Sequence, residues 1–313
     1  MSSVPEAEPS PLTEVPPQLP IGISPAAFHR FVRGGQAVKL GLFLVGMATL
    51  VTGRVSALDG ALFAGFYVAT MLGVTAGLHR LFSHRSFEAH PALRAVLAVL
   101  GTMAGQGTVL IWVATHRKHH QHSDRALDPH SPHGETGTPV GRFWHAHIGW
   151  ILSFYPRDWE RYVPDLLRDP LLVWLHRRSM LVVLSGILLP GVLGGVLTQS
   201  WQGALSGALW GGWVRLFLVE QSTLLVNSAG HLWGRRPFES RDHSTNAWWL
   251  AVLTLGDGWH NGHHAFPASA RHGLNRFEPD PTFWAIRLWR AIRLADKVVV
   301  PSPEQIENRR RAG

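Results

Sequence analysis

Two short stretches concentrate histidine within a chain that contains long apolar runs. The first, "HRKHHQHSD" (116–124), holds four histidines in seven residues, and the second, "WHNGHHAFP" (259–267), repeats part of its spacing. Residues three and four apart lie on one face of a helix, so each stretch would present its imidazoles from a single stripe. The triplets with this spacing are His116, His119 and His120, and His260, His263 and His264.

Two further pairs follow long apolar segments. "HRLFSH" supplies His79 and His84, five residues apart. An ideal helix would separate them by about 140°, so their convergence requires the helix to end or bend between them. "NSAGH" supplies Asn227 and His231, which are four apart and share a helix face. These positions, together with the triplets, indicate a shared metal centre.

The donor set narrows the choice of metal. The chain has no cysteine, which excludes thiolate ligands, disulfides and thiol nucleophiles. Imidazole suits zinc, copper, iron and nickel. One zinc ion takes three or four ligands, so nine grouped histidines exceed its needs, whereas two ions with four or five nitrogens each would use all of them. The other ten histidines lack a repeated spacing and are interpreted as ordinary buried or surface side chains: His29, His90, His122, His130, His133, His145, His147, His176, His243 and His272.

Four apolar segments are long enough to span a bilayer, which takes about 20 residues each. They are residues 37–55, 60–78, 180–199 and 203–226. The 14 tryptophans suit a protein with two membrane–water interfaces, although the segments could also be buried helices of a soluble protein. A fifth apolar stretch, 91–113, is expected to be an amphipathic or surface-lying helix, because an odd number of spans would put the histidine groups on opposite sides of the membrane.

The net charge of +8 lies mainly outside the apolar segments. The link "TQSWQG" between the last two has no Lys or Arg, whereas the region from Arg80 to Arg178 is rich in both. The positive-inside tendency therefore places both termini and the active site in the cytoplasm, with the basic residues near anionic lipid. No nucleic-acid-binding module is recognisable, so no nucleic-acid partner is expected.

We therefore predict an all-α integral membrane protein with four transmembrane helices and a cytoplasmic helical cap that holds a histidine-rich di-metal site. The membrane domain would cover residues 26–299, with the cap formed by 79–179 and 227–299. Residues 1–25, rich in Pro, Ser and Glu, are expected to be a disordered tail, and 300–313 a basic C-terminal tail.

The boxes "HRLFSH", "HRKHH" and "HNGHH", with "NSAGH" ahead of the last, resemble those of the membrane fatty-acyl desaturases. The similarity is greatest to the acyl-CoA (stearoyl) Δ9 desaturases and their bacterial relatives, and it runs from about residue 30 to 290. It implies two iron ions, with O₂ as co-substrate. The resemblance implies that one iron is held by His79, His84, His116, His120 and His264, and the other by His119, His231, His260 and His263.

The resemblance also implies roles for residues near the ligands. Asn227 would position a metal-bound water, and Gln106 and Trp112 would line the acyl tunnel. In animal acyl-CoA enzymes an arginine that contacts CoA commonly lies two residues before the second box, where this chain has Ala114. The departure leaves open whether CoA or a lipid carries the acyl chain.

The implied activity is the insertion of a cis double bond, at position 9, into a saturated acyl chain. Mid-chain methylene hydrogens cannot be removed by a side-chain acid or base, so the chemistry must reside in an oxygen-activating cofactor. The sequence has no Gly-rich dinucleotide fingerprint, so electrons would come from a separate ferredoxin or cytochrome b5-type donor with its reductase.

Two other functions are compatible with the same residues. A membrane hydroxylase would share the first hydrogen abstraction, and the boxes alone do not separate the two reactions. A membrane metal transporter or metal-binding protein would use histidine ligands as well, but a transporter is expected to carry them inside the spans, along a pathway.

Overall fold

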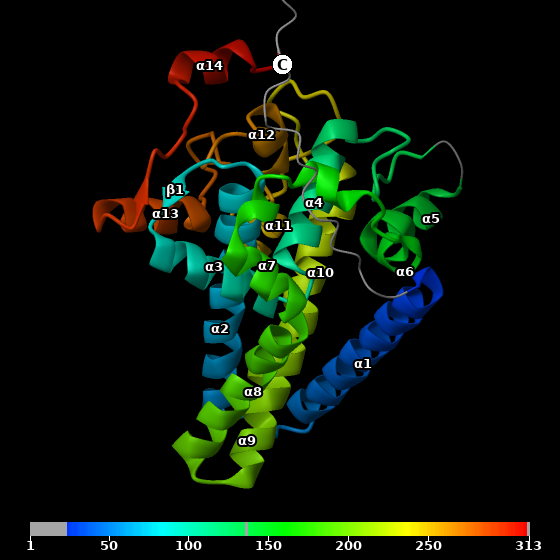
Figure 1. Cartoon of the computed structure of the whole chain (residues 1–313), viewed down its shortest axis with the longest axis vertical. Coiled ribbons are helices and arrows are strands. Elements are labelled where there is room, and N and C mark those ends of the chain that lie inside the picture. Colours follow the sequence, from blue (N-terminus) through cyan, green and yellow to red (C-terminus); the bar gives the residue numbers. More distant parts are fainter. Residues whose placement is uncertain (1–23, 135–136, 312–313) are drawn as a thin grey trace, which may run out of the picture.

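The computed structural model describes residues 24–134 and 137–311, and almost every element in them is a helix (Figure 1). The one pair of strands in these ranges, β1 (Glu88–Ala89) and β2 (Ala295–Asp296), is antiparallel and two residues long on each side. The predicted all-α class is therefore confirmed. The expected tail 1–25 lies outside the described residues except for Ser24, which caps the first helix, and Pro25, which begins it.

Three helices in the described residues are long and apolar enough to cross a bilayer. The first is α1 (Pro25–Val51). The second is α2 (Ala57–Leu72), which continues without a break as the π-helical segment η1 (Gly73–Ser83). The third is α8 (Ser179–Thr198). They correspond to three of the four predicted spans.

The fourth predicted span is helical but divided into three elements. These are α9 (Trp201–Gly207), the π-helical η5 (Ala208–Val214) and α10 (Arg215–Ser228), which follow one another directly. In Figure 1, α8 and α9 lie side by side at the narrow end of the molecule, and α10 runs back towards the wide end. This run is not among the three that meet the length and apolarity criteria.

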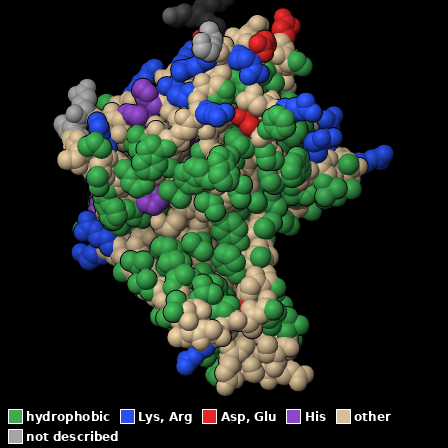
Figure 2. Space-filling model, turned by 180° about the vertical axis from the view of Figure 1, so that it is seen from behind, with side chains coloured by type: hydrophobic (Ala, Val, Ile, Leu, Met, Phe, Trp, Pro, Cys, Tyr) green, Lys and Arg blue, Asp and Glu red, His purple; other side chains and the backbone are tan. Residues whose placement is uncertain are grey.

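The long helices display apolar side chains on their outer faces. On α8, Leu188 is 61% exposed and Val196 is 68% exposed. Figure 2 shows hydrophobic side chains covering the middle of the molecule, with most Lys and Arg side chains gathered on the wide half. A soluble monomer rarely exposes a continuous apolar surface of this extent, so the surface indicates contact with lipid.

The buried charged side chains Lys39, Arg215 and Glu220 of the apolar helices have hydrogen-bond partners inside the protein. Lys39 of α1 pairs with Glu220 of α10 at 2.5 Å, and both side chains are buried. The guanidinium of Arg215 is buried and donates to the backbone carbonyls of Met103 (2.9 Å) and Gly186 (2.5 Å). Ionisable groups at membrane depth are costly unless partnered inside the protein, so these contacts explain how Arg215 and Glu220 fit an apolar segment.

The stretch 91–113 forms two helices instead of the single surface-lying helix that we predicted. They are α3 (Pro91–Met103) and α4 (Val109–His122). The chain breaks between them at Gly105 and Gly107, whose φ angles of +67° and +105° favour glycine. At 13 residues α3 is too short to span a bilayer. The break redirects α4 into the cap, together with the second histidine box.

The cap is a set of short helices at the wide end of the bundle (Figure 1). It is built from α4 and from α5 (Pro139–Trp144), η2 (His145–Gly149), α6 (Trp150–Ser153), η3 (Trp159–Tyr162), η4 (Leu166–Arg168), α7 (Pro170–Arg177), η6 (Ala229–His231), α11 (Trp248–Leu253), α12 (His260–Ala265), α13 (Pro281–Ala291) and α14 (Pro303–Asn308).

The C-terminal segment 300–311 packs on the cap. The backbone amide of Glu239 donates to the carbonyl of Arg309 (2.8 Å), and that of Arg311 donates to the carbonyl of Pro237 (3.0 Å). The side chain of Arg309 also donates to the carbonyl of Ala265 (2.9 Å), the last residue of α12. The segment therefore supports the helix that carries the third histidine box.

The helix that ends at His79 and His84 is held against α3 by a close crossing. A Cβ added at Gly73 would overlap the backbone of Leu100 and Gly101, whereas one added at Gly60, in the preceding helix, would meet nothing within 4 Å. Small residues at such crossings let two helix backbones touch.

We predict that Gly73→Ala lowers the thermal stability of the detergent-solubilised protein, at a cost of about 1–3 kcal/mol from overpacking. Gly60→Ala is the matched control and should leave the melting temperature unchanged or slightly higher. The measurement is fluorescence-detected size exclusion after heating. Equal melting temperatures for the two variants would show that the crossing is not tight.

Candidate metal centre

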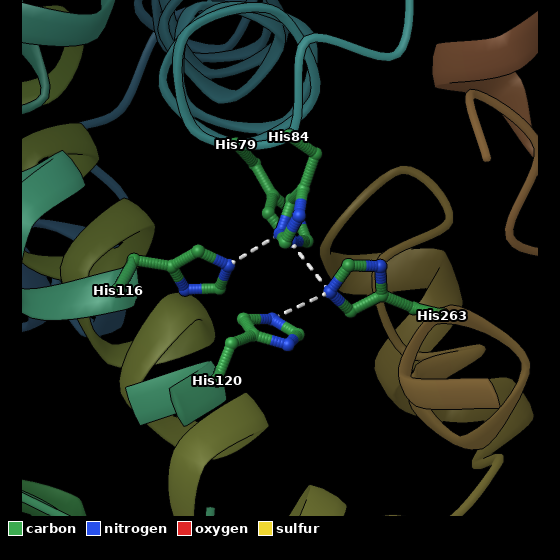
Figure 3. Close-up of side chains that lie close together, drawn as sticks. All are labelled: His79, His84, His116, His120 and His263. Atoms are coloured by element: carbon green, nitrogen blue, oxygen red, sulfur yellow. Dashed lines mark hydrogen bonds between the residues drawn. The ribbon is translucent and has the colours of Figure 1, made fainter. Parts of the chain in front are cut away.

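All nine grouped histidines meet inside the cap and form two clusters. We name them by size. The five-histidine cluster contains His79, His84, His116, His120 and His263, and the four-histidine cluster contains His119, His231, His260 and His264. Within each cluster the nitrogens available for a metal all lie within 4.8 Å of one another. Figure 3 shows the first cluster, with rings from η1, α4 and α12 pointing to one centre.

The π-helical winding of η1 brings His79 and His84 together. The amide of His84 donates to the carbonyl of His79 (3.1 Å), five residues earlier, which is the hydrogen bond of a π-helix. Their ring centroids lie 5.0 Å apart. We predicted an end or a bend between them. The helix does end between them, at Ser83, with His84 as the capping residue, and its last turns are widened to the π-helical form.

Helix geometry divides the second box between the two clusters. His116 and His120 are four residues apart on α4 and contribute to the five-histidine cluster, while His119 contributes to the four-histidine cluster. Residues four apart are nearly in line on a helix, whereas the residue one position earlier points to the other side of that line. A single short helix therefore supplies both clusters.

The third box follows the same rule, and this corrects the expected division of its histidines. His260 and His264, four apart on α12, belong to the four-histidine cluster, and His263 belongs to the five-histidine cluster. Nε2 of His263 lies 2.9 Å from Nε2 of His120 and 3.0 Å from Nε2 of His79. The expected assignment of His264 with His79 and of His263 with His260 is therefore wrong. It separated His260 from His264, although these two residues share a face of α12.

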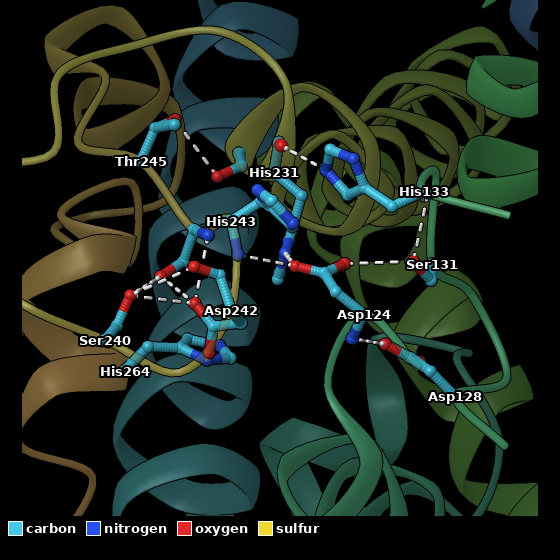
Figure 4. Close-up of polar contacts among 12 residues, drawn as sticks. Asp124, Asp128, Ser131, His133, His231, Ser240, Asp242, His243, Thr245 and His264 are labelled. Carbon is cyan, nitrogen blue, oxygen red and sulfur yellow. Dashed lines mark hydrogen bonds and ion pairs between the residues drawn. The ribbon is translucent and has the colours of Figure 1, made fainter. Parts of the chain in front are cut away.

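Four of the nine imidazoles are oriented by buried carboxylates, which the sequence analysis did not identify. The Nδ1 atoms of these rings donate to Asp oxygens: His79 to Asp257 (2.8 Å), His119 to Asp128 (2.9 Å), His231 to Asp124 (2.9 Å) and His264 to Asp242 (2.5 Å). Figure 4 shows three of these aspartates in one network. Such a bond fixes the tautomer and leaves the Nε2 lone pair free for a metal. The one signal in the sequence that could have indicated these carboxylates is the position of Asp124 and Asp128, which closely follow the second box.

The facing lone pairs fit a bound cation. His119 and His264 both donate from Nδ1, so in the neutral form each ring carries a lone pair on Nε2, and these two atoms are 3.4 Å apart. No hydrogen bond can join two neutral rings in this arrangement, whereas two nitrogens bound side by side to one metal ion would stand about 3 Å apart. The residues of both clusters therefore fit metal ions held by imidazole.

Burial keeps His120, His260, His263 and His264 in the neutral form that binds metal. Burial, followed by the proximity of other imidazoles, holds the pKa of His120, His260 and His263 well below the usual value. Burial lowers the pKa of His264 to about 4, although Asp242 opposes the shift. Burial alone would raise the pKa of Asp242, but its hydrogen bond and attraction to His264 lower it instead.

A small cavity reaches the clusters from the side of the membrane helices. Its volume is about 30 Å³, and its lining includes Met71, Trp112, Thr223 and Asn227 beside His116 and His260. The ring of Trp112 stacks on that of His116 at 5.1 Å, and its Nε1 donates to Oε1 of Gln106 (3.2 Å). Asn227 and Trp112 therefore line this cavity, and Gln106 holds the indole of Trp112 by a hydrogen bond.

Three histidines outside the repeated spacings lie directly behind the ligands. Nε of Arg80 donates to the fully buried His272 (3.2 Å), whose Nδ1 is 3.1 Å from Asp257. The ring of His130 lies 4.4 Å from that of His119. Nε2 of His133 donates to the carbonyl of His231 (2.8 Å). Tertiary contacts bring these residues to the site, so no spacing in the sequence indicates them.

We predict that the metal-free protein loses stability in mild acid. An unfolded histidine titrates near 6.5, whereas folded His264 titrates at about 4, so over this interval the unfolded chain binds protons that the folded chain does not. Stability should therefore fall as the pH falls from about 6.5 towards 4. Chelator-treated protein should melt at a lower temperature at pH 5.0 than at pH 7.5 in circular dichroism, and His264→Gln should narrow the difference. Identical melting temperatures would contradict this account.

Comparison with known proteins agrees with this geometry. The family model described as fatty acid desaturase matches residues 60–285. The chain is 40% identical over 265 residues to a hex-5-enoyl-[acyl-carrier protein] acetylenase of Moorena producens (strain JHB), which covers 82% of each protein. It is 41% identical to an sn-2 palmitoyl-lipid 9-desaturase of Nostoc sp. (strain 36), over 74% of this chain and 78% of the relative.

A third relative is an sn-1 stearoyl-lipid 9-desaturase of Anabaena variabilis, 40% identical over 77% of this chain and 83% of that protein. The matched region contains the three histidine boxes and most of the long helices that position them. The chain therefore belongs to the fatty acid desaturase family, and its activity is that of an oxidoreductase that desaturates fatty-acyl chains.

Proposed function

We propose that this desaturase uses two iron ions and O₂ to introduce a cis double bond at position 9 of a saturated acyl chain attached to a membrane lipid. The observation that carries the proposal is the pair of imidazole clusters whose Nε2 atoms face one another inside the cap. The relatives named as lipid 9-desaturases support the position of the double bond and the lipid carrier. The relative named as an acetylenase acts on a chain carried by acyl-carrier protein, so acyl-carrier protein is the alternative carrier to lipid.

The nine histidines would hold the metal ions, one ion in each cluster. Iron bound there supplies the oxygen-activating chemistry that removes two adjacent, unactivated methylene hydrogens. Asn227, which lines the cavity beside His260, would hold a water molecule next to the centre. The carboxylates of Asp124, Asp128, Asp242 and Asp257 keep four of the ligand rings in fixed orientations.

The role of the remaining site residues is to position the acyl chain and exclude water. The cavity beside the clusters has an apolar wall that includes Met71, Val74 and Val226, which suits a methylene chain. Trp112 closes the wall next to His116, and Gln106 holds Trp112 through a hydrogen bond and is itself held by Thr223. We assign Gln106 and Trp112 to the lining of the acyl tunnel on these contacts.

We further propose four spans, with both termini and the cap on the cytoplasmic side. The run α9–η5–α10 would be the fourth span, because it packs along α8 and its two charged residues are partnered internally. An even number of spans puts both histidine groups on one side of the membrane. The clusters lie at the ends of the long helices and within the cap, which favours an enzyme over a transporter whose ligands line a path through the spans.

Electrons would come from a separate protein, of the ferredoxin or cytochrome b5 type, with its reductase. Lys and Arg side chains gather on the cap (Figure 2), which suits an acidic donor. The acyl carrier is assigned to lipid because Ala114 stands where the animal acyl-CoA enzymes commonly have an arginine that contacts CoA. Ala114 is buried and offers no charged group to such a ligand.

We predict that His120→Ala abolishes desaturation while the protein still inserts into the membrane. The reason is that Nε2 of His120 faces the five-histidine cluster, 2.9 Å from Nε2 of His263. His145→Ala is the matched control, because His145 is exposed on the cap. The measurement is the unsaturated fraction of lipids from expressing cells, normalised to membrane-bound protein. Full activity of His120→Ala would remove this residue from the proposed ligands.

We predict that expression in a host lacking its own desaturase yields fatty acids with a cis double bond at position 9, found first in glycerolipids. Gas chromatography with mass spectrometry of each lipid class, after a short pulse of labelled saturated acid, gives both the bond position and the carrier. First appearance in the acyl-CoA or acyl-carrier-protein pool would contradict the lipid assignment. A hydroxylated product without a new double bond would favour the hydroxylase alternative.

A further inference from the structure

The carboxylates that orient the ligands are divided unequally between the two clusters. In the four-histidine cluster, three of the four rings donate to a carboxylate, through the pairs His119–Asp128, His231–Asp124 and His264–Asp242. Only His260 has an Nδ1 without a hydrogen-bond partner there. In the five-histidine cluster, the one such pair among the described residues is His79–Asp257.

The charge of Asp257 is also largely cancelled by its surroundings. The buried guanidinium of Arg80 donates to Oδ1 of Asp257 (3.0 Å), on the opposite side of the carboxylate from His79. Arg80 pairs with Asp280 as well (3.1 Å), so the group around the five-histidine cluster contains two carboxylates and one guanidinium. Its net charge is −1 when Asp280 is counted.

The three carboxylates of the four-histidine cluster form no ion pair with a Lys or Arg in the described residues. Asp124 accepts from the amide of His243 (2.7 Å), and Asp128 accepts from the amide of Asp124 (2.9 Å). Asp242 accepts from the amide of Ser244 (3.0 Å), and Arg236 donates to its backbone carbonyl, not to its carboxylate. The three carboxylates carry a charge of −3, or −2 when the neighbouring Arg236 is counted, and amides, hydroxyls and imidazoles hold them (Figure 4).

This difference bears directly on metal affinity. A buried divalent ion needs compensating negative charge, because the low dielectric of the interior strengthens both attraction and the cost of an isolated charge. A carboxylate that accepts from Nδ1 also makes the imidazole a stronger ligand, and removing it typically weakens metal binding 10- to 100-fold. Both effects favour tighter metal binding by the four-histidine cluster. The number of nitrogen ligands alone would favour tighter binding by the five-histidine cluster.

We propose that the four-histidine cluster is the high-affinity site, which fills first, and that the five-histidine cluster takes the second ion more weakly. Asp124, Asp128 and Asp242 are the positioning residues that create the difference. They are pre-arranged for it, because the backbone amide of Asp124 holds the carboxylate of Asp128 and the backbone amide of His243 holds that of Asp124. The inference rests on the proposed metal centre.

The test is a metal titration of the full chain in detergent, with Co²⁺ as the probe and a competing chelator. Bound metal per chain is measured by equilibrium dialysis and elemental mass spectrometry. We expect two ions per chain with dissociation constants at least 10-fold apart. His84→Ala should keep the tight ion and lose the weak one, and His260→Ala should do the reverse.

The carboxylates are tested separately. Asp242→Asn and Asp128→Asn should each weaken the tight ion about 10- to 100-fold and leave the weak ion unchanged. Asp169→Asn is the matched control, because Asp169 pairs with Arg94 away from the clusters and caps α7, a position that Asn also satisfies. If one aspartate variant does not elute as a folded species, the other carries the test, and the histidine variants do not depend on either.

The possible failures are distinguishable. Fewer than two ions bound to the wild-type chain, or binding that neither His84→Ala nor His260→Ala changes, would refute the proposed centre itself. Two ions with equal affinity, or a tight ion that is lost in His84→Ala and kept in His260→Ala, would refute the order of filling while leaving the centre intact. Equal weakening of both ions by Asp242→Asn would refute the role of the carboxylates.

Discussion

Neutral imidazoles cannot direct their nitrogen lone pairs at one another across about 3 Å in a buried space unless a cation lies between them. This constraint shapes the cap of the protein. His119 and His264 illustrate it, because their Nδ1 atoms are committed to Asp128 and Asp242 and their Nε2 atoms face each other. A metal ion bound between them would turn this repulsion into an attraction that holds helices α4 and α12 together.

The rest of the fold supplies these rings from distant parts of the chain. A π-helical segment aligns His79 with His84, and α4 and α12 each divide one box between the two clusters. Supporting contacts come from further away, including Arg309 on the last residue of α12. The membrane helices fix the relative positions of these elements through close crossings and internally paired charges, as between Lys39 and Glu220.

Much of this arrangement could be predicted from the sequence, because box spacing and apolar length are local properties. The nine histidines and three of the predicted spans could be identified in this way. The π-helical winding of η1 could not, since no spacing in its sequence distinguishes it from an α-helix. The two helices within 91–113 were missed because Gly105 and Gly107 were interpreted as part of one apolar run.

The carboxylates near the ligands, and the contact of His272 with Arg80, are long-range, so no local pattern contains them. The division of His263 and His264 was within reach of helix geometry and was nevertheless assigned wrongly.

The most direct test of the central claim is anomalous diffraction at the iron absorption edge from crystals of the protein purified with its native metal. The account predicts two peaks, one within bonding distance of Nε2 of His79 and His263 and the other within bonding distance of Nε2 of His119 and His264. A single peak, or peaks away from these nitrogens, would contradict it.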